Sequence, residues 1–288
     1  MRRFGNFVAI DWSGARGARQ QGIALAHVAE GDRPPSLLTP PGGWSREKIL
    51  EWLVLHAEAG TDMIVGLDLS PALPFADRHS YFPGWPDSPS HAKALWQFVD
   101  RICGDEPYLA ANNFVHHPDA RRHFRHQGEC GDMFEAGAGR MRQVEKSQRT
   151  QGLSPYSCFN LVGAAQVGKS SLTGMRVLHR LNGRIPFWPF DPPPERGPLL
   201  IEIYTALPAR EAGIRKGSKI RDAATLDVAL AALGSKPHRP LRRYDDHATD
   251  AILTAAWLRG AAARAELWSP SGLTPALART EGWTFGVL

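Results

Sequence analysis

The chain has little cysteine and no long apolar run. Its three cysteines, Cys103, Cys130 and Cys158, are odd in number, widely spaced and without a C-x-x-C pair, which argues against a disulfide framework and against a cysteine zinc site. No apolar run approaches the roughly 20 residues that a membrane span needs. The start at Met1 leads directly into a predicted strand, without a signal-peptide core. We therefore expect a cytoplasmic protein with reduced cysteines and no membrane partner.

Repeats and low-complexity segments are also absent, so we expect neither a solenoid nor a long disordered region. Hydrophobic residues make up 43% and charged residues 22% of the 288 positions, which is ordinary for a globular protein. A chain of this length can bury a full core. We predict one elaborated α/β domain over residues 1–288, with its core at 1–70 and 198–265, an insertion at 71–197 and a C-terminal extension at 266–288.

Basic side chains outnumber acidic ones, and they are concentrated in two segments. The formal net charge is +5. Residues 116–184 carry eleven basic side chains against five acidic ones, and residues 206–243 carry nine against three. Such segments favour a polyanionic partner such as nucleic acid. A solvated surface with arginine-rich helices would have the same composition.

Two apolar runs of matching design each end in an aspartate. Residues 7–10 lead into Asp11, and residues 63–67 lead into Asp68. A buried strand that ends in an acid followed by turn residues delivers the carboxylate to the edge of a sheet. In open α/β sheets the chemistry collects outside the carboxyl ends of the strands. Parallel neighbours would therefore bring the two aspartates together, and the alternative is two unrelated, solvated strand ends.

The elements between these two runs predict a single crossover. Residues 22–28 and 36–38 are typical of a second and a third strand, and Ser45 is placed to cap a helix that ends near Gly60. The resulting order β-β-β-α-β makes the first and fourth strands parallel neighbours. Further along the chain, we predict helices around 91–102, 170–181, 222–233 and 246–263, a core strand at 199–204, and a C-terminal stretch with Trp268, Trp283 and Phe285 that packs back on the body.

A third acidic stretch opens the final predicted helix. Asp245 or Asp246 is explained by N-capping. His247 and Asp250 are three residues apart and share a helix face. Asp250 lies beyond the first turn, next to Ile252, where an unpaired charge would be costly unless a cation meets it. Three converging carboxylates raise one another's pKa and usually hold a metal, and this donor set suits Mg²⁺ or Mn²⁺ better than zinc.

This donor set predicts a mechanism. Two ions about 3.5–4 Å apart could clamp a phosphodiester, with one activating water and the other stabilising the leaving oxygen. Asp11 would bridge the ions, Asp68 and Asp250 would each hold one, and His247 would be a further ligand or orient the water. Glu202 could be an outer ligand, a hydrogen-bond partner for a loop or a strand-surface acid. We take these five residues as candidate catalytic residues, and all but Glu202 as candidate metal ligands.

These stretches resemble the RNase H-like nuclease superfamily. Asp11 on the first strand, Asp68 at the end of the fourth and the His247-x-x-Asp250-Ala pattern look most like the RuvC-type resolvase arrangement, which permits Asp or His at the histidine position. The fuller match is with bacterial proteins grouped as domain-of-unknown-function family 429, predicted RNase H-fold nucleases, and it also takes in residues 162–168 and 202–208.

The resemblance implies a fold and an activity. The fold would be an RNase H-like mixed sheet (β-β-β-α-β-α-β-α) flanked by helices, with a long insertion after the fourth strand. The activity would be a Mg²⁺- or Mn²⁺-dependent nuclease that hydrolyses phosphodiester bonds in DNA or RNA. Resolvase-like enzymes are often dimers, so the resemblance also allows for a homodimer.

A competing motif lies within the predicted insertion. Residues 163–170 match the pattern G-x-x-x-x-G-K-[ST], and a short strand is predicted just before it at 159–162. Such a loop would cradle the phosphates of a nucleotide, which would make the chain a nucleotide-binding or hydrolysing enzyme. The motif positions are Gly163, Gly168, Lys169 and Ser170.

The rest of the chain gives this motif little support. Only one convincing strand follows it, where a P-loop core needs several βα units. The same loop could hold the backbone phosphates of a nucleic acid, or it could be a glycine-rich turn that lets a helix pack closely. A further alternative is an RNase H-like scaffold that binds nucleic acid or protein without cutting.

Overall fold

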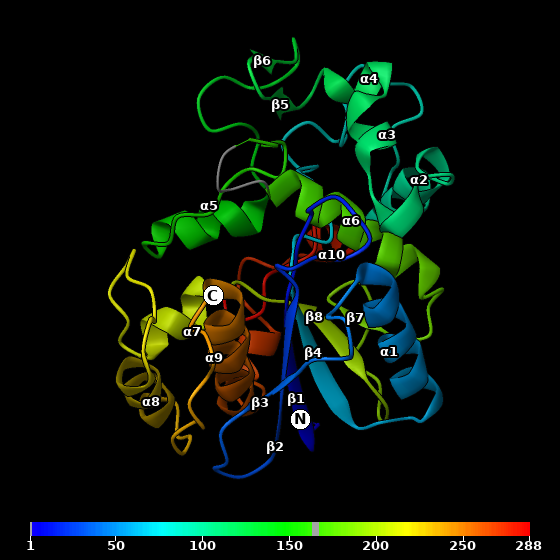
Figure 1. The fold of residues 1–288 in the computed structure, drawn as a ribbon. Helices are drawn as coiled ribbons and strands as arrows, with labels where there is room; N and C mark the ends of the chain where they lie inside the picture. Colours follow the sequence, from blue (N-terminus) through cyan, green and yellow to red (C-terminus); the bar gives the residue numbers. More distant parts are fainter. Residues whose placement is uncertain (1, 163–166) are drawn as a thin grey trace.

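The computed structural model of the protein describes residues 2–162 and 167–288, and its centre is a six-stranded mixed sheet in the order β3-β2-β1-β4-β8-β7 (Figure 1). Strands β1 to β3 pair antiparallel, whereas β1, β4, β8 and β7 run parallel. The mixed α/β class is confirmed. The strands are β1 (Asn6–Asp11), β2 (Ala24–Ala29), β3 (Ser36–Leu38), β4 (Met63–Asp68), β7 (Phe187–Trp188) and β8 (Leu199–Glu202).

The predicted crossover is confirmed. Helix α1 (Arg46–Glu58) joins β3 to β4, and β4 lies parallel to β1 in the sheet. The side chain of Ser45 accepts a hydrogen bond from the backbone N–H of Lys48, so it caps the helix as expected. The connection therefore places the carboxyl ends of β1 and β4 at the same edge.

Helices cover both faces of the sheet, because side chains along each strand alternate between the two faces. Val8, Ile10 and Val65 belong to one apolar cluster, with α1, α2 (Ala92–Ile102) and α6 (Val167–Arg180). Phe7 and Ile64 belong to the other, with α7 (Ala206–Glu211), α8 (Ala223–Ala232) and α9 (Asp246–Ala261). Figure 1 shows α1 on one side of the strands and α7 to α9 on the other.

The segment predicted as an insertion lies largely beyond the carboxyl ends of the strands, where Figure 1 shows α5 and α6 above the sheet. It also supplies β7, a sixth strand that pairs parallel with β8 and was not predicted. A two-residue strand is too short for its periodicity to be recognised. The other elements here are η1 (Pro107–Leu109), α3 (Asn112–His116), α4 (Pro118–Arg121), β5 (Arg125–His126), β6 (Glu129–Cys130) and α5 (Gln143–Thr150).

The C-terminal stretch packs back on the body, as predicted. It contains η2 (Ala265–Trp268) and α10 (Pro275–Thr280), and then brings Trp283 and Phe285 into the core. Thr284 forms an isolated β-bridge with Glu202 at the end of β8. No helix in the part of the chain that the structure describes is long and apolar enough to cross a membrane.

Candidate functional site

The last residues of β1 and β4 lie side by side, as the sequence predicted. The parallel register makes Asp11 and Asp68 partners, so both leave the sheet at its carboxyl edge. Alternation along the strands puts both on the face that carries Phe7 and Ile64, which is the face covered by α9. Two acids from strands far apart in the sequence therefore point to the same side of the same edge.

Helix α9 lies close to this face and begins at the same edge. The side chain of Asp245 caps the helix by accepting a hydrogen bond of 2.9 Å from the N–H of Ala248. A Cβ at Gly66 would lie 2.5 Å from Ile203 Cγ2 and 3.2 Å from a methyl group of Leu258 on α9, so a side chain at Gly66 would push the layers apart. Close packing of the layers brings the first turn of α9 to the strand ends.

His247 of α9 reaches the carboxylate of Asp11. Its Nδ1 lies 3.0 Å from Asp11 Oδ1, in a hydrogen bond that also counts as an ion pair when the ring is protonated. This bond raises the pKa of His247 above its ordinary value. Burial raises the pKa of Asp11, although His247 acts in the opposite direction. The two groups thus compensate each other at the end of β1.

Asp250, one turn further along α9, faces a cation that sequence analysis did not identify as part of the site. Lys219 Nζ lies 3.8 Å from Asp250 Oδ2 and 3.1 Å from Asp246 Oδ2. Burial raises the pKa of Asp250 to about 7, against the opposing effect of Lys219. Burial lowers the pKa of Lys219, but the two aspartates together raise it above its ordinary value. Lys219 is therefore only a partial counter-charge for Asp250.

Asp68 has no such partner. No lysine, arginine or histidine within residues 2–162 and 167–288 forms an ion pair with its carboxylate. Burial raises the pKa of Asp68 well above its ordinary value, and the negative charges of Asp11, Asp250 and Glu202 raise it further. A cation next to Asp68 would act against these effects, because it favours the charged form of the carboxyl group.

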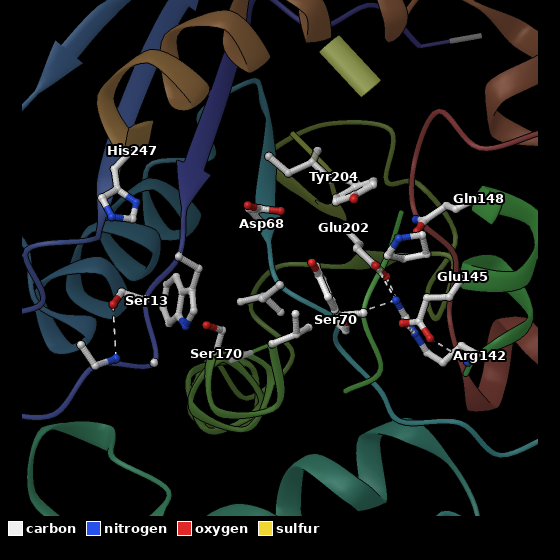
Figure 2. A pocket seen from close by; sticks show the side chains of 18 residues that line it. Ser13, Asp68, Ser70, Arg142, Glu145, Gln148, Ser170, Glu202, Tyr204 and His247 are labelled. Carbon is white, nitrogen blue, oxygen red and sulfur yellow. Dashed lines mark hydrogen bonds and ion pairs between the residues drawn. The ribbon is translucent and has the colours of Figure 1, made fainter. Parts of the chain in front are cut away.

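A cavity of about 400 Å³ opens in front of Asp68. Figure 2 shows the Asp68 side chain in the middle of this space, with His247 on one side and Glu202 and Arg142 on the other. Ser13 and Ser170 lie along its wall. Of the predicted catalytic residues, Asp68, His247 and Glu202 line the cavity, whereas Asp11 and Asp250 are not among its lining residues.

Glu202 is fully engaged in a buried ion-pair network. Its Oε1 and Oε2 accept hydrogen bonds of 2.5 and 2.9 Å from Arg142, and Oε1 also accepts one of 2.7 Å from Thr284. Arg142 in turn donates to Glu145, Ser70 and the carbonyl of Glu281, which completes its five N–H donors. Of the three roles considered for Glu202, this geometry favours the hydrogen-bond partner.

The separation of Glu202 from Asp68 follows from strand alternation. Glu202 is the register partner of Leu67, the residue before Asp68, so its side chain leaves the opposite face of the sheet. On that face it meets Arg142, which burial alone would make less basic. Glu202 and Glu145 outweigh that effect and raise the pKa of Arg142 well above its ordinary value. All five N–H groups of Arg142 are used within this network, which favours a structural role for it.

The G-x-x-x-x-G-K-[ST] segment is described in part, since Gly163 lies outside the described residues. Gly168, Lys169 and Ser170 form the first turn of α6. The strand predicted at 159–162 is wrong, because Asn160 makes an isolated bridge with Arg125 and residues 159–162 form no strand of the sheet. The strand that a P-loop requires is therefore missing from this position.

Close packing explains the second glycine of the segment. A Cβ at Gly168 would lie 2.4 Å from the carbonyl oxygen of Cys158 and 2.8 Å from Leu161. A Cβ at Gly14, in the loop after β1, would lie 2.6 Å from the backbone nitrogen of Ser170. These distances favour the interpretation of the segment as a glycine-rich turn that lets α6 pack closely. They also place the start of α6 against the loop that follows β1.

The candidate ligands are gathered at one edge without forming a ready-made cage. No group of three or more His, Cys, Asp or Glu side chains in the described part of the chain is arranged to hold a metal ion. The donor types still fit Mg²⁺ or Mn²⁺, because Asp11, Asp68 and Asp250 offer carboxylate oxygens. His247 and Lys219 offset part of the negative charge of Asp11 and Asp250. A bound cation would compete with these two side chains.

Comparisons of the chain with protein-family models, with curated proteins and with solved structures found no match.

Proposed function

We propose that this chain is a Mg²⁺- or Mn²⁺-dependent hydrolase of phosphodiester bonds in nucleic acid, built on an RNase H-like sheet. The observation that carries the proposal is the register match of Asp11 with Asp68, together with a cavity lined by an Asp68 carboxylate that forms no ion pair within the described residues. The strand order supports the RNase H-like fold, because three antiparallel strands are followed through one helix by a fourth strand parallel to the first.

Each candidate residue has a role in this proposal. A divalent cation held by Asp11, Asp68 and Asp250 would polarise the phosphate and lower the pKa of a bound water. Asp68 would offer its carboxylate directly to the cavity. His247 lines the same cavity and would orient the attacking water once its bond to Asp11 is released. Glu202 would position the strand end through Arg142 and make no contact with the cation.

Two basic residues, Arg16 and Lys169, are sequence neighbours of residues that line the cavity, which supports an anionic substrate. Ser170 and Val167 of the first turn of α6 line the cavity, and Lys169 lies between them in sequence. Burial lowers the pKa of Lys169, and the positive charge of Arg16 lowers it further, so these two cations lie close to each other. Substrate phosphates would relieve this repulsion.

A second function is favoured by a specific observation. His247 and Lys219 already neutralise part of the acid group, and no three-ligand metal site is assembled in the described residues. A protein that binds nucleic acid without cutting it would need no metal site at this edge of the sheet. The two functions differ in turnover, so hydrolysis decides between them.

The test is hydrolysis of labelled oligonucleotides with Mn²⁺, with Mg²⁺ and with EDTA. We expect turnover that requires the cation and falls by about 100-fold or more in Asp11→Asn, Asp68→Asn and Asp250→Asn. Asp105→Asn, which changes an exposed aspartate that does not line the cavity, is the matched control and should retain full activity. Activity retained in two of the three variants would exclude the proposed mechanism, and binding without turnover would favour the second function.

A further inference from the structure

A second cavity adjoins the candidate site. Its volume is about 490 Å³, and it shares Pro155 and Tyr156 with the cavity in front of Asp68. Both residues belong to the loop between α5 and α6. The two cavities are thus neighbours along one surface, with this loop forming the wall between them.

Tyr156 is an exposed aromatic side chain at that wall. It is 57% exposed, among the highest values for a large apolar residue in the described chain. It lies close enough to Tyr204 to affect its ionisation. Burial raises the pKa of Tyr204 to about 12, with further contributions from Asp68 and Tyr156. An unburied ring beside the acid group offers a flat surface on which a planar ligand can stack.

The second cavity combines an apolar lining with polar edges. Phe134, Met141 and Leu153 provide apolar surface, and Ser154 and Asn160 provide hydrogen-bonding groups. A nucleobase has the same two properties, a flat apolar face and a polar edge. The cavity is therefore suited to a planar base that enters from the side of Tyr156.

Two arginines at this cavity are free of acidic partners. Arg125 and Arg149 line it, both are exposed, and neither forms an ion pair with any acid that the structure describes. In contrast, the arginines nearby in the sequence, Arg121, Arg122 and Arg140, each have one. An uncompensated pair of guanidinium groups next to an apolar cavity is suited to the phosphates that flank a base.

The opposite side of the candidate site lacks such an aromatic group. A cavity of about 560 Å³ there shares His247 with the first cavity and is lined by Arg19, Arg242 and Arg243. Its aromatic residue, Trp44, is only 8% exposed and donates its indole N–H to the carbonyl of Leu38. That side can bind a phosphate backbone, whereas the Tyr156 side can also bind a base.

We propose that the cavity behind Tyr156 binds an unpaired nucleobase of single-stranded nucleic acid, with the base stacked on Tyr156 and the adjacent phosphates on Arg125 and Arg149. This inference rests on the proposed function and narrows it to a substrate class. Stacking on an aromatic side chain requires an exposed base face, which a single strand has and an intact duplex lacks. The strand would pass from this cavity into the adjoining one, which Asp68 lines.

The test is binding in EDTA, so that no cleavage occurs. Fluorescence anisotropy would compare a labelled single strand of about 12 nucleotides with the blunt duplex of the same sequence. We expect the single strand to bind more tightly. Tyr156→Ala should weaken single-strand binding roughly 5- to 100-fold, whereas Tyr156→Phe, which keeps the ring, should bind like the wild type. The double variant Arg125→Ala/Arg149→Ala should weaken binding and reduce its salt dependence.

Matched controls are available among exposed residues that line neither of these two cavities. Tyr108→Ala removes another exposed tyrosine, and Arg3→Ala removes an exposed arginine before the amino end of β1. Both should bind like the wild type. Equal binding of Tyr156→Ala and wild type, or an equal loss for single strand and duplex, would overturn the inference. Cation-dependent hydrolysis that is lost in Asp68→Asn would still support the proposed function in that case, so the two failures are distinguishable.

Discussion

Two groups of acids lie at the carboxyl edge of the same sheet and differ in how their charge is balanced. Around Arg142, the carboxylates of Glu202 and Glu145 bind one fully buried guanidinium whose five N–H groups all have acceptors. In the group of Asp11, Asp68 and Asp250, His247 pairs with Asp11, and Lys219 lies 3.8 Å from Asp250. Asp68 itself has no partner cation among the described residues.

This difference suggests which acids stabilise the fold and which can take part in chemistry. A buried carboxylate with a bidentate arginine has its charge satisfied and has no reason to bind a further cation. A carboxylate whose pKa is raised by burial and by three other acids is stabilised by any cation that enters. This contrast is the basis for proposing a structural role for the Arg142 group and a functional role for the Asp68 group.

The largest effect on stability should come from removing Arg142 from its group with Glu202 and Glu145, which we call the closed group. Arg142→Met leaves Glu202 and Glu145 buried without a counter-charge, so we expect a loss of about 3–5 kcal/mol in the free energy of unfolding, measured in urea. Arg180→Met is the matched control. Arg180 is 40% exposed and pairs with Asp100, so it should cost about 0–1 kcal/mol. A loss below 1 kcal/mol for Arg142→Met would show that the closed group is not the structural one.

The second largest effect concerns how the free energy of unfolding depends on pH. It involves the group of Asp11, Asp68 and Asp250, which we call the open group. Burial raises the pKa of Asp250 from 3.8 to about 7, with Lys219 opposing and Asp11 adding to the shift. The folded state therefore binds this proton more tightly than the unfolded state, and the contribution of Asp250 to stability is lost as pH rises towards 7. The gain of Asp250→Asn over the wild type, without metal, should grow from near zero at pH 4 to at most about 4 kcal/mol above pH 7.

Urea unfolding at several pH values measures this gain directly. Asp105→Asn, which removes an exposed aspartate, should show a difference from the wild type that does not change with pH. A gain for Asp250→Asn that shrinks as pH rises would mean that Asp250 is stabilised in its charged form and is not part of an open group.

The smallest effect should come from Lys219. The ion pair of Lys219 with Asp250 is 48% and 24% exposed at its two side chains, so Lys219→Met should lower metal-free stability by about 0.5–1 kcal/mol. The variant should also gain more stability than the wild type from added Mn²⁺, because the competing cation is gone. Arg221→Met is the control and should show no extra gain, because Asp246 is the one acid with which Arg221 forms an ion pair in the described part of the chain. An equal gain in both variants would exclude competition between Lys219 and a metal.

Local patterns predicted the acids of the open group and much of the sheet. Asp11 and Asp68 each follow an apolar run, and the single helix between strands fixes their parallel register. The three-residue spacing of His247 and Asp250 placed both on one face of α9. The alternation around Glu202 was also visible in sequence, and it explains why this acid lies on the opposite face from Asp68.

The partners of these acids could not be predicted in the same way. Arg142 lies 60 residues from Glu202, and Lys219 lies in a loop 31 residues before Asp250, so both pairings depend on how loops cross the sheet edge. Within the basic segments 116–184 and 206–243, the sequence does not distinguish Arg142 and Lys219 from the other basic residues. Tyr156 was missed for the same reason, since exposure of a loop residue leaves no periodic pattern in the sequence.

The most direct test of this account is Mn²⁺ binding followed by electron paramagnetic resonance of the free ion. We predict that the wild type binds Mn²⁺, that Asp68→Asn weakens binding by about 10-fold or more, and that Glu202→Gln leaves it unchanged while it destabilises the fold. A wild type that binds no Mn²⁺ at millimolar concentration, or an Asp68→Asn variant that binds as tightly as the wild type, would contradict the division between an open and a closed acid group.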